Sequence, residues 1–167
     1  MKKIIIILFF TTIILVGFNE KEKIIIPKNS IRFRVIANSN NKEDQKLKLS
    51  VKSDVEKELY KLLNNVDTVE TARKVIAHNL DKVDEILKKY SVTYDISYGN
   101  NYFPIKNYKG INYKEGNYES LVITLGEGLG ENWWCVLFPP LCLLDEDKNV
   151  DETNYELYAK KIINKIK

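Results

Sequence analysis

The sequence predicts an α+β domain, in which about four antiparallel strands form a sheet with an αα-hairpin and a C-terminal helix packed on it. Short segments near residues 31–37, 91–98, 118–125 and 133–138 have the alternating or two-sided apolar character of strands. Longer segments near residues 42–64, 67–89 and 151–167 carry apolar residues at steps of three and four, the spacing of one helix face. We therefore expect helices to cover one face of the sheet.

The first strand places Ile31, Phe33 and Val35 on one side and ends at the turn-prone asparagines of residues 38–41. A helix follows from about residue 42 to 64, with acidic residues in its first turn, where the helix dipole favours them. The spacing of Asp67 and Glu70 is that of a capping box and predicts a second helix that continues to about residue 89. The short link between the two helices predicts an antiparallel hairpin.

The second strand, residues 91–98, is expected to return antiparallel to the first strand. Residues 118–125 and 133–138 are predicted to pair as a hairpin around the GEGLG sequence of residues 126–130. We interpret GEGLG as a turn, because a phosphate-binding loop would open a helix and because Glu127 and Glu131 would repel an anion. The last helix is expected to open at Asp151.

The N-terminus predicts export. Lys2 and Lys3 precede the largely apolar residues 4–18, which as a helix would span about 22 Å, less than the roughly 30 Å of a bilayer core. No small-x-small cleavage site ends this segment, so residues 1–18 are either a signal peptide or an uncleaved signal anchor, which would attach the chain to the membrane. Residues 19–30 are interpreted as a tether, and residues 31–167 as a single exported α+β domain.

Charge and motifs exclude several classes of function. Two of the 26 basic residues lie in the export segment, which leaves 24 basic against 23 acidic residues, so the charge gives no case for nucleic acid. His78 is the only histidine, and no GxSxG sequence presents a serine beside it. Together with two cysteines that lack CxxC spacing, it gives too few ligands for a closed metal site. We therefore expect no catalytic residues, no metal and no cofactor.

Aromatic residues concentrate in two places, a predicted loop of about eighteen residues after residue 98 and the NWWCVLFPPLC segment of residues 132–142. Aromatic rings with polar tips are typical of protein interfaces, and long loops in compact domains are often functional. For the loop, an interface and plain cover of the core remain open alternatives. For the two tryptophans, we expect at least one ring to pack in the core. The residues predicted to bind a partner are Tyr102, Phe103, Pro104 and Tyr108 first, and Trp133 and Trp134 second.

Cys135 and Cys142 are the only cysteines of the chain. A disulfide between them is favoured, because the domain is expected to be exported and because Pro139 and Pro140 bend the chain between them. Two buried thiols are the alternative.

Five segments carry a resemblance to the stage II sporulation protein R family of endospore-forming bacteria. They are RFRVIANSN (32–40), EDQKLKLSV (43–51), NYFP (101–104), GNYESLVITLGEGLG (116–130) and NWWCVLFPPLC (132–142). The likeness runs from about Ile31 to Leu144. It implies a small signalling protein that is made in the forespore and exported into the space between forespore and mother cell. It also implies a partner, a membrane-embedded aspartic protease of the mother cell that cuts a sigma factor precursor when activated.

We therefore expect a non-enzymatic signal, secreted or held by its signal anchor, that binds and activates this protease. The alternative is an extracytoplasmic cell-envelope hydrolase or envelope-binding domain. The sequence does not show which two acidic residues would act together in such a site. Departures from the family pattern lie at Ile105, Asn107 and Lys109 of the loop and in the weak cleavage site.

Overall fold

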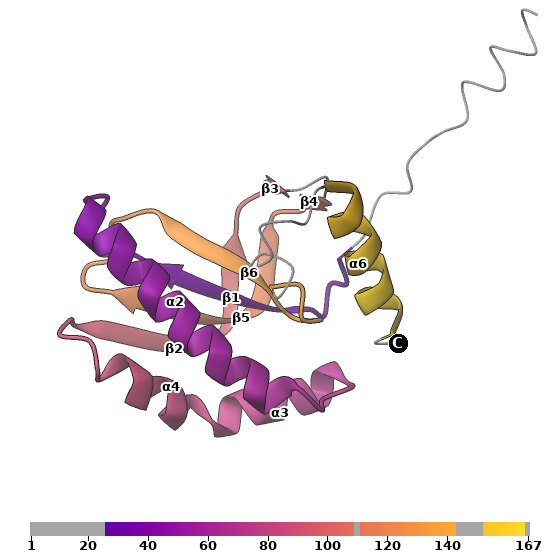
Figure 1. Ribbon diagram of the computed structural model, residues 1–167, viewed down its shortest axis with the longest axis horizontal. Helices are drawn as coiled ribbons and strands as arrows, with labels where there is room; N and C mark the ends of the chain where they lie inside the picture. The colour runs from indigo at the N-terminus through magenta and orange to yellow at the C-terminus, as the bar shows by residue number, and fades with distance from the viewer. Residues whose placement is uncertain (1–25, 109–110, 143–151, 166–167) are drawn as a thin grey trace, which may run out of the picture.

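The computed structural model describes residues 26–108, 111–142 and 152–165. The order of elements is β1 (Ile31–Ile36), α2 (Lys42–Leu63), α3 (Val69–His78), α4 (Leu80–Leu87), β2 (Tyr94–Phe103), β3 (Lys106–Tyr108), β4 (Ile111–Tyr113), β5 (Gly116–Leu125), β6 (Asn132–Phe138) and α6 (Glu152–Lys165). The predicted α+β class is confirmed, with four strands in the main sheet and a helix near the C-terminus (Figure 1).

The strand order of the main sheet is β2–β5–β1–β6, and most of its pairs are antiparallel. β2 runs antiparallel to β1 as expected, because it is antiparallel to β5 and β5 is parallel to β1, but β5 lies between them. One expectation about neighbours is wrong. β5 and β6 do not form a hairpin, because β1 lies between them.

The GEGLG connection explains this arrangement. It passes the end of β1 and is hydrogen-bonded to the residues that follow that strand. The amide of Leu129 donates to the carbonyl of Asn38 at 3.0 Å, and the amide of Gly130 donates to the carbonyl of Ala37 at 2.9 Å. Gly126 and Gly128 adopt positive φ angles of 55° and 65°, as expected for a turn. The loop is therefore a bridge across β1, and its residues continue into a strand and not into a helix.

The second predicted helix is broken into α3 and α4 at Asn79. The Asn79 side chain donates to the carbonyl of Val75 at 2.7 Å. An asparagine that hydrogen-bonds the preceding turn competes with the helical ladder, which accounts for the break. α2, in contrast, begins at Lys42 as predicted, because the side chain of Asn41 caps it by accepting from the amide of Asp44 at 2.7 Å.

The predicted aromatic loop is mostly β-structure. β2 continues to Phe103 and pairs over its whole length with β5, from Tyr94 opposite Leu125 to Phe103 opposite Gly116. Beyond this ladder, β3 and β4 form a two-stranded ribbon. Polar residues interrupt the apolar alternation here, so only the pairing with β5 reveals the strand.

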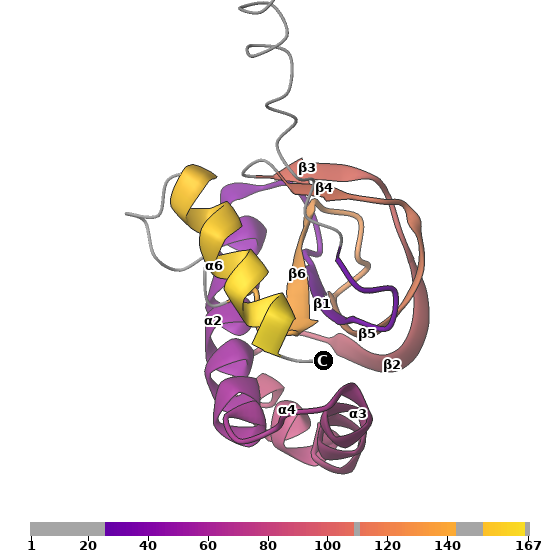
Figure 2. The ribbon, with the colours of Figure 1, turned by 90° about the vertical axis from the view of Figure 1, so that its right-hand side faces the viewer.

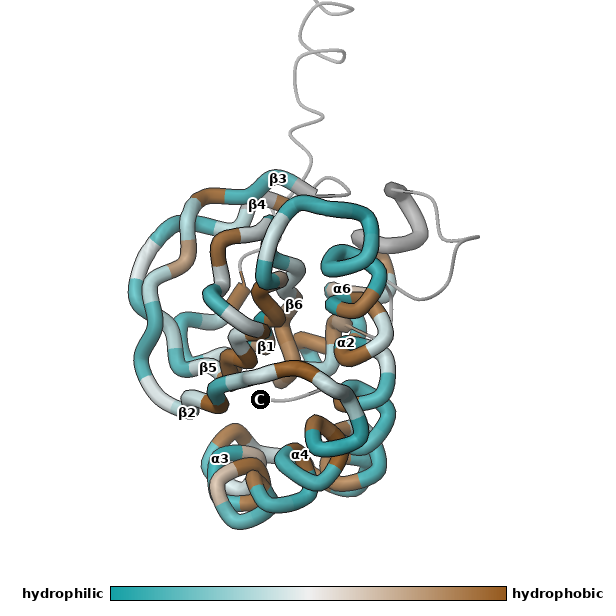
Figure 3. Tube along the Cα trace, turned by 90° about the vertical axis from the view of Figure 1, so that its left-hand side faces the viewer, coloured by the Kyte–Doolittle hydropathy of each residue, from teal (hydrophilic) through white to brown (hydrophobic). Residues whose placement is uncertain are grey.

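The core has two parts, one on each face of the sheet. The larger part joins alternate residues of β1 and β5, among them Phe33 and Ile123, to the buried faces of α2, α3 and α4. The smaller part joins Trp134 and Val136 of β6 to Ala159 of α6 and to the β3–β4 ribbon. α6 packs on the smaller part, whereas α2, α3 and α4 pack on the larger part, so the expectation that all helices cover one face is wrong. In Figure 2, α6 is the helix nearest the viewer, in front of α2. Figure 3 shows the hydrophobic residues gathered around β1 and β6 in the centre.

Candidate partner-binding surface

An exposed edge runs from the end of β2 to the start of β3. Tyr102 is 57% exposed and Ile105 is 60% exposed, with Pro104 exposed between them. The Tyr102 hydroxyl donates to a carboxylate oxygen of Glu115 at 3.0 Å, and this hydrogen bond raises the pKa of Tyr102. The Tyr102 carbonyl accepts from Nη2 of Arg34 at 2.8 Å. The edge therefore presents apolar surface, and at Tyr102 the side chain is held by Glu115 and the backbone by Arg34.

Aromatic rings support this edge from beneath. Phe103, the neighbour of Tyr102, is 0% exposed. Its ring meets that of Trp134 edge to face, with centroids 5.2 Å apart and planes at 80°. Tyr113 of β4 packs on the same indole, with centroids 5.4 Å apart. These contacts join the ribbon to β6 and fix the direction of the exposed edge.

Cations fill the spaces between these rings. Arg32 of β1 is only 1% exposed, and its guanidinium carbon lies 3.4 Å from the ring centroid of Tyr118 and 4.9 Å from that of Phe103. Burial lowers the pKa of Arg32 to about 10, so the group stays charged at neutral pH. Arg34 stacks 3.8 Å from the Phe103 centroid, and Nζ of Lys106 lies 4.6 Å from that of Trp134.

Sequence reasoning missed these cations. Arg32 and Arg34 alternate with apolar residues of β1, which is the pattern of a solvent-facing row. The signal that could have located them is the two-sided apolar pattern of β6. A strand with two apolar faces needs cover on both, so its neighbour β1 must also be covered on both.

The structure separates the six residues predicted to bind a partner. Tyr102 and Pro104 lie together on the exposed edge, while Phe103 and Trp134 lie buried below it. Trp133 is half-buried on the opposite face of β6, where its ring meets Phe33 edge to face at 5.8 Å. The side chain of Tyr108 lies outside the described residues. The burial of Trp134 confirms that one tryptophan ring packs in the core, whereas binding of a partner by these residues stays a prediction.

The two cysteines meet beneath α2. Their Cα atoms are 5.3 Å apart and the structure places their sulfur atoms at bonding distance, in keeping with the favoured disulfide. Glu56 of α2 is buried beside them, and its carboxylate and the two sulfurs lie within 4.8 Å of one another. Sequence reasoning missed Glu56, because an acid within an amphipathic helix is usually solvated.

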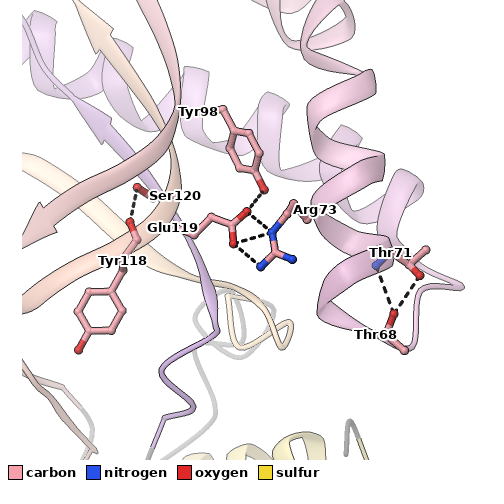
Figure 4. A network of polar contacts seen from close by, with 7 residues as sticks. All are labelled: Thr68, Thr71, Arg73, Tyr98, Tyr118, Glu119 and Ser120. Atoms are coloured by element: carbon pink, nitrogen blue, oxygen red, sulfur yellow. Dashed lines mark hydrogen bonds and ion pairs between the residues drawn. The ribbon is translucent and has the colours of Figure 1, made fainter.

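A polar network fastens α3 to the sheet (Figure 4). Arg73 of α3 donates twice from Nε and once from Nη2 to the carboxylate of Glu119 on β5, at 2.8 to 3.0 Å. The Tyr98 hydroxyl of β2 donates to the same carboxylate at 2.7 Å. Burial would raise the pKa of Glu119, but the hydrogen bonds from Arg73 and Tyr98 and the charge of Arg73 outweigh it and hold this pKa below its ordinary value.

His78 is an exposed helix residue whose Nδ1 lies 2.7 Å from the carbonyl oxygen of Lys74, as expected for a solvated side chain at a helix end. Across residues 26–108, 111–142 and 152–165, no helix combines the length and the apolar character that crossing a bilayer requires. The predicted export segment, residues 1–18, lies outside the described residues.

The chain has clear relatives. Residues 27–148 match the sequence model of a family described as stage II sporulation protein R (spore_II_R). The stage II sporulation protein R of Bacillus subtilis (strain 168) is 36% identical in an alignment 163 residues long, and the match covers 87% of this chain and 73% of that protein. No solved structure matches the chain. The family match spans well over half of the chain, so this protein belongs to the stage II sporulation protein R family.

Proposed function

We propose that this protein is an exported signal of endospore formation that binds and activates a membrane-embedded aspartic protease of the mother cell. The protease would then process a sigma factor precursor. Membership of a family named for sporulation and not for an enzymatic activity carries this proposal. In it, the signal acts in the space between forespore and mother cell, either free or held by its N-terminal segment.

The exposed edge of Tyr102, Pro104 and Ile105 supports a role in recognition. Large apolar side chains on a fixed backbone lose little conformational freedom when a partner covers them. The buried rings and cations below give the edge its rigidity, because Arg34 holds the Tyr102 carbonyl and also stacks on Phe103. A partner of matching shape would therefore meet a surface that needs little rearrangement.

Activation requires a difference in affinity. A ligand shifts its receptor toward the active arrangement only to the extent that it binds this arrangement more tightly than the inactive one. A tenfold preference corresponds to about 1.4 kcal/mol, which one aromatic contact at the centre of an interface is able to supply. In the proposal, the contact of Tyr102 with the protease is made fully only in the active arrangement.

The direct test is reconstitution in a host that does not sporulate. The full chain, with its own N-terminal segment, is co-expressed with the membrane protease and the sigma factor precursor. Precursor cleavage is followed by immunoblot. Cleavage that requires both this chain and an intact catalytic aspartate in the protease supports the proposal.

Two results count against it. Cleavage that proceeds equally without this chain would remove its role as activator. Release of fragments from purified cell wall by the purified chain alone would instead support the envelope hydrolase. An active-site variant of the protease serves as the matched control, since it leaves the signal and the precursor unchanged.

A further inference from the structure

A carboxylate and two sulfur atoms converge in the interior of this protein. Glu56 comes from the middle of α2, Cys135 from β6 and Cys142 from the turn that follows β6. All three residues are buried, Glu56 is 0% exposed, and their reactive atoms lie within 4.8 Å of one another. Three segments that are distant in sequence thus bring an acid–base group to a cysteine pair.

Two neighbours on α2 contact the carboxyl group of Glu56. Lys52, one turn earlier on α2, forms an ion pair with it, and the Tyr60 hydroxyl, one turn later, donates to it at 3.3 Å. A buried charge without such partners would cost several kcal/mol. A helix position that faces the core is ordinarily apolar. Here an ion pair and a hydrogen bond instead stabilise a buried proton acceptor beside the two sulfurs.

We propose that Glu56, Cys135 and Cys142 form a thiol–disulfide exchange site that reacts with small disulfides and dithiols, with Glu56 as the proton acceptor of the resolving cysteine, Cys142. The inference concerns a site on the face of β6 that packs under α2, and it does not depend on the proposed binding of a protease.

The exposures of the two cysteine residues assign their order of reaction. Cys135 is 5% exposed and Cys142 is 0% exposed. In the reduced form, the Cys135 thiolate attacks an incoming disulfide, forms a mixed disulfide and releases one thiolate, which takes a proton from water. The proton that Cys135 lost to reach its thiolate form also passes to water. Cys142 is then the resolving cysteine.

Cys142 needs an internal base, because its buried thiol has no direct access to water. Its proton passes to Glu56, and the resulting thiolate attacks the sulfur of Cys135. The Cys135–Cys142 bond forms as the mixed disulfide breaks, and the second leaving thiolate takes the proton from Glu56. Two electrons pass from the cysteine pair to the incoming disulfide, which leaves as two thiols, and Glu56 is regenerated.

The carbonyl of Val136 is a hydrogen-bond acceptor for the Cys142 thiol in the reduced state. Its oxygen lies 3.1 Å from Sγ of Cys142, so a thiol at this position has an acceptor ready. The Cys142 thiol therefore has an acceptor once the pair is reduced. A shared metal ion would need both sulfurs as separate thiolate ligands, whereas the structure brings them to bonding distance.

The test measures ring closure in the full chain, purified in detergent. The protein is reduced with dithiothreitol, desalted and mixed with oxidised glutathione between about pH 6 and pH 9. Free thiols and the glutathione adduct are quantified by acid quench and mass spectrometry. In the unaltered chain, we expect the closure step to vary little with pH near neutrality, because Glu56 removes the proton internally.

In Glu56→Gln, we expect closure at pH 7 to slow by about a hundredfold or more, the lower end of what positioned bases contribute. The rate should now rise about tenfold per pH unit, and the adduct on Cys135 should accumulate. Glu58→Gln is the matched control, since Glu58 lies on the same helix and pairs with Lys61 near the surface. It should leave the rate and its pH profile unchanged.

Two outcomes would overturn the inference. One is a Glu56→Gln protein that closes at the rate and with the pH profile of the control. The other is an unaltered chain whose closure rate itself rises tenfold per pH unit, a measurement that needs no variant to fold. Cys142→Ser should trap the adduct on Cys135, and an adduct that forms faster on Cys142 in Cys135→Ser than on Cys135 in Cys142→Ser would reverse the assigned order and contradict the proposal.

Discussion

Arg73 of α3 donates hydrogen bonds to both carboxylate oxygens of Glu119 on β5, with Nε 2.8 Å from Oε1 and Nη2 2.8 Å from Oε2. Planar, two-point pairing of this kind is stronger than a single contact between exposed charges. It connects the helical layer to the sheet at the point where Tyr98 of β2 also donates to Glu119.

Loss of this pair should destabilise the fold modestly. We expect Arg73→Gln to lower the free energy of unfolding by about 1 kcal/mol, since solvent screens an arginine side chain that is 43% exposed. Urea denaturation followed by circular dichroism gives the value. Lys61→Gln, which breaks the exposed pair with Glu58, is the control and should change stability by less than about 0.5 kcal/mol. Equal effects of both variants would contradict the special role of the two-point pair.

Acid should remove the contribution of Glu119. Its pKa in the fold is held below the ordinary value of 4.5, so the unfolded chain binds the proton more readily. The stabilisation is therefore complete above about pH 4.5 and is lost as pH falls through the lower pKa of the folded state. Unfolding free energies measured between about pH 3 and pH 6 should fall less steeply with acid in Glu119→Gln. A variant with an unchanged slope would show that other groups account for the acid sensitivity.

The cysteine pair should make a measurable contribution to stability. Closing a loop of this length restricts the unfolded chain by roughly 2 to 3 kcal/mol on the chain-entropy estimate. We expect the free energy of unfolding of the Cys135→Ser, Cys142→Ser double variant, measured by urea denaturation, to be lower by that amount. The oxidised chain should also contain no free thiols in a maleimide assay under denaturing conditions. Two titratable thiols in the protein isolated from the exported compartment would favour the reduced alternative.

Gly126 should resist replacement. Its φ of 55° is a conformation that side chains rarely adopt, and a Cβ atom there would collide with the side chain of Asn38. We expect Gly126→Ala to cost about 1 to 3 kcal/mol of unfolding free energy. Gly99→Ala is the control, since no heavy atom lies within 4 Å of an added Cβ at that position. Thermal melts of both variants would falsify the assignment if they shifted equally.

Tyr102 is the residue whose loss should separate binding from folding. We expect Tyr102→Ala to reduce precursor cleavage in the reconstituted host at least fivefold, because truncation of an aromatic hot spot costs 1 kcal/mol or more. Its thermal stability should stay close to that of the parent, since the ring is mostly exposed. Leu129→Ala, at the other end of β5, tests whether any exposed apolar side chain has this effect. Undiminished cleavage with Tyr102→Ala would move the proposed surface elsewhere.

Sequence patterns predicted best the features that depend on residues close together in the chain. The bounds of α2 follow from apolar spacing and from the cap at Asn41, both of which depend on a few adjacent residues. The break at Asn79 is also local, but it depends on one side-chain hydrogen bond that apolar periodicity does not reveal. The aromatic edge could be assigned to an exposed segment, while which of Tyr102 and Phe103 faces solvent could not.

The sequence by itself determined the α+β class, the helical hairpin region, the turn at GEGLG and the family, because each of these depends on short-range spacing or on runs of residue types. The tertiary structure decided that β1 lies between β5 and β6, that Arg32 is enclosed by rings, and that Glu56 meets Cys135. Each of these contacts joins segments far apart in the chain. The pairing of the strands depends on burying both faces of the sheet at once. This requirement involves the whole chain, so no single segment of the sequence predicts it.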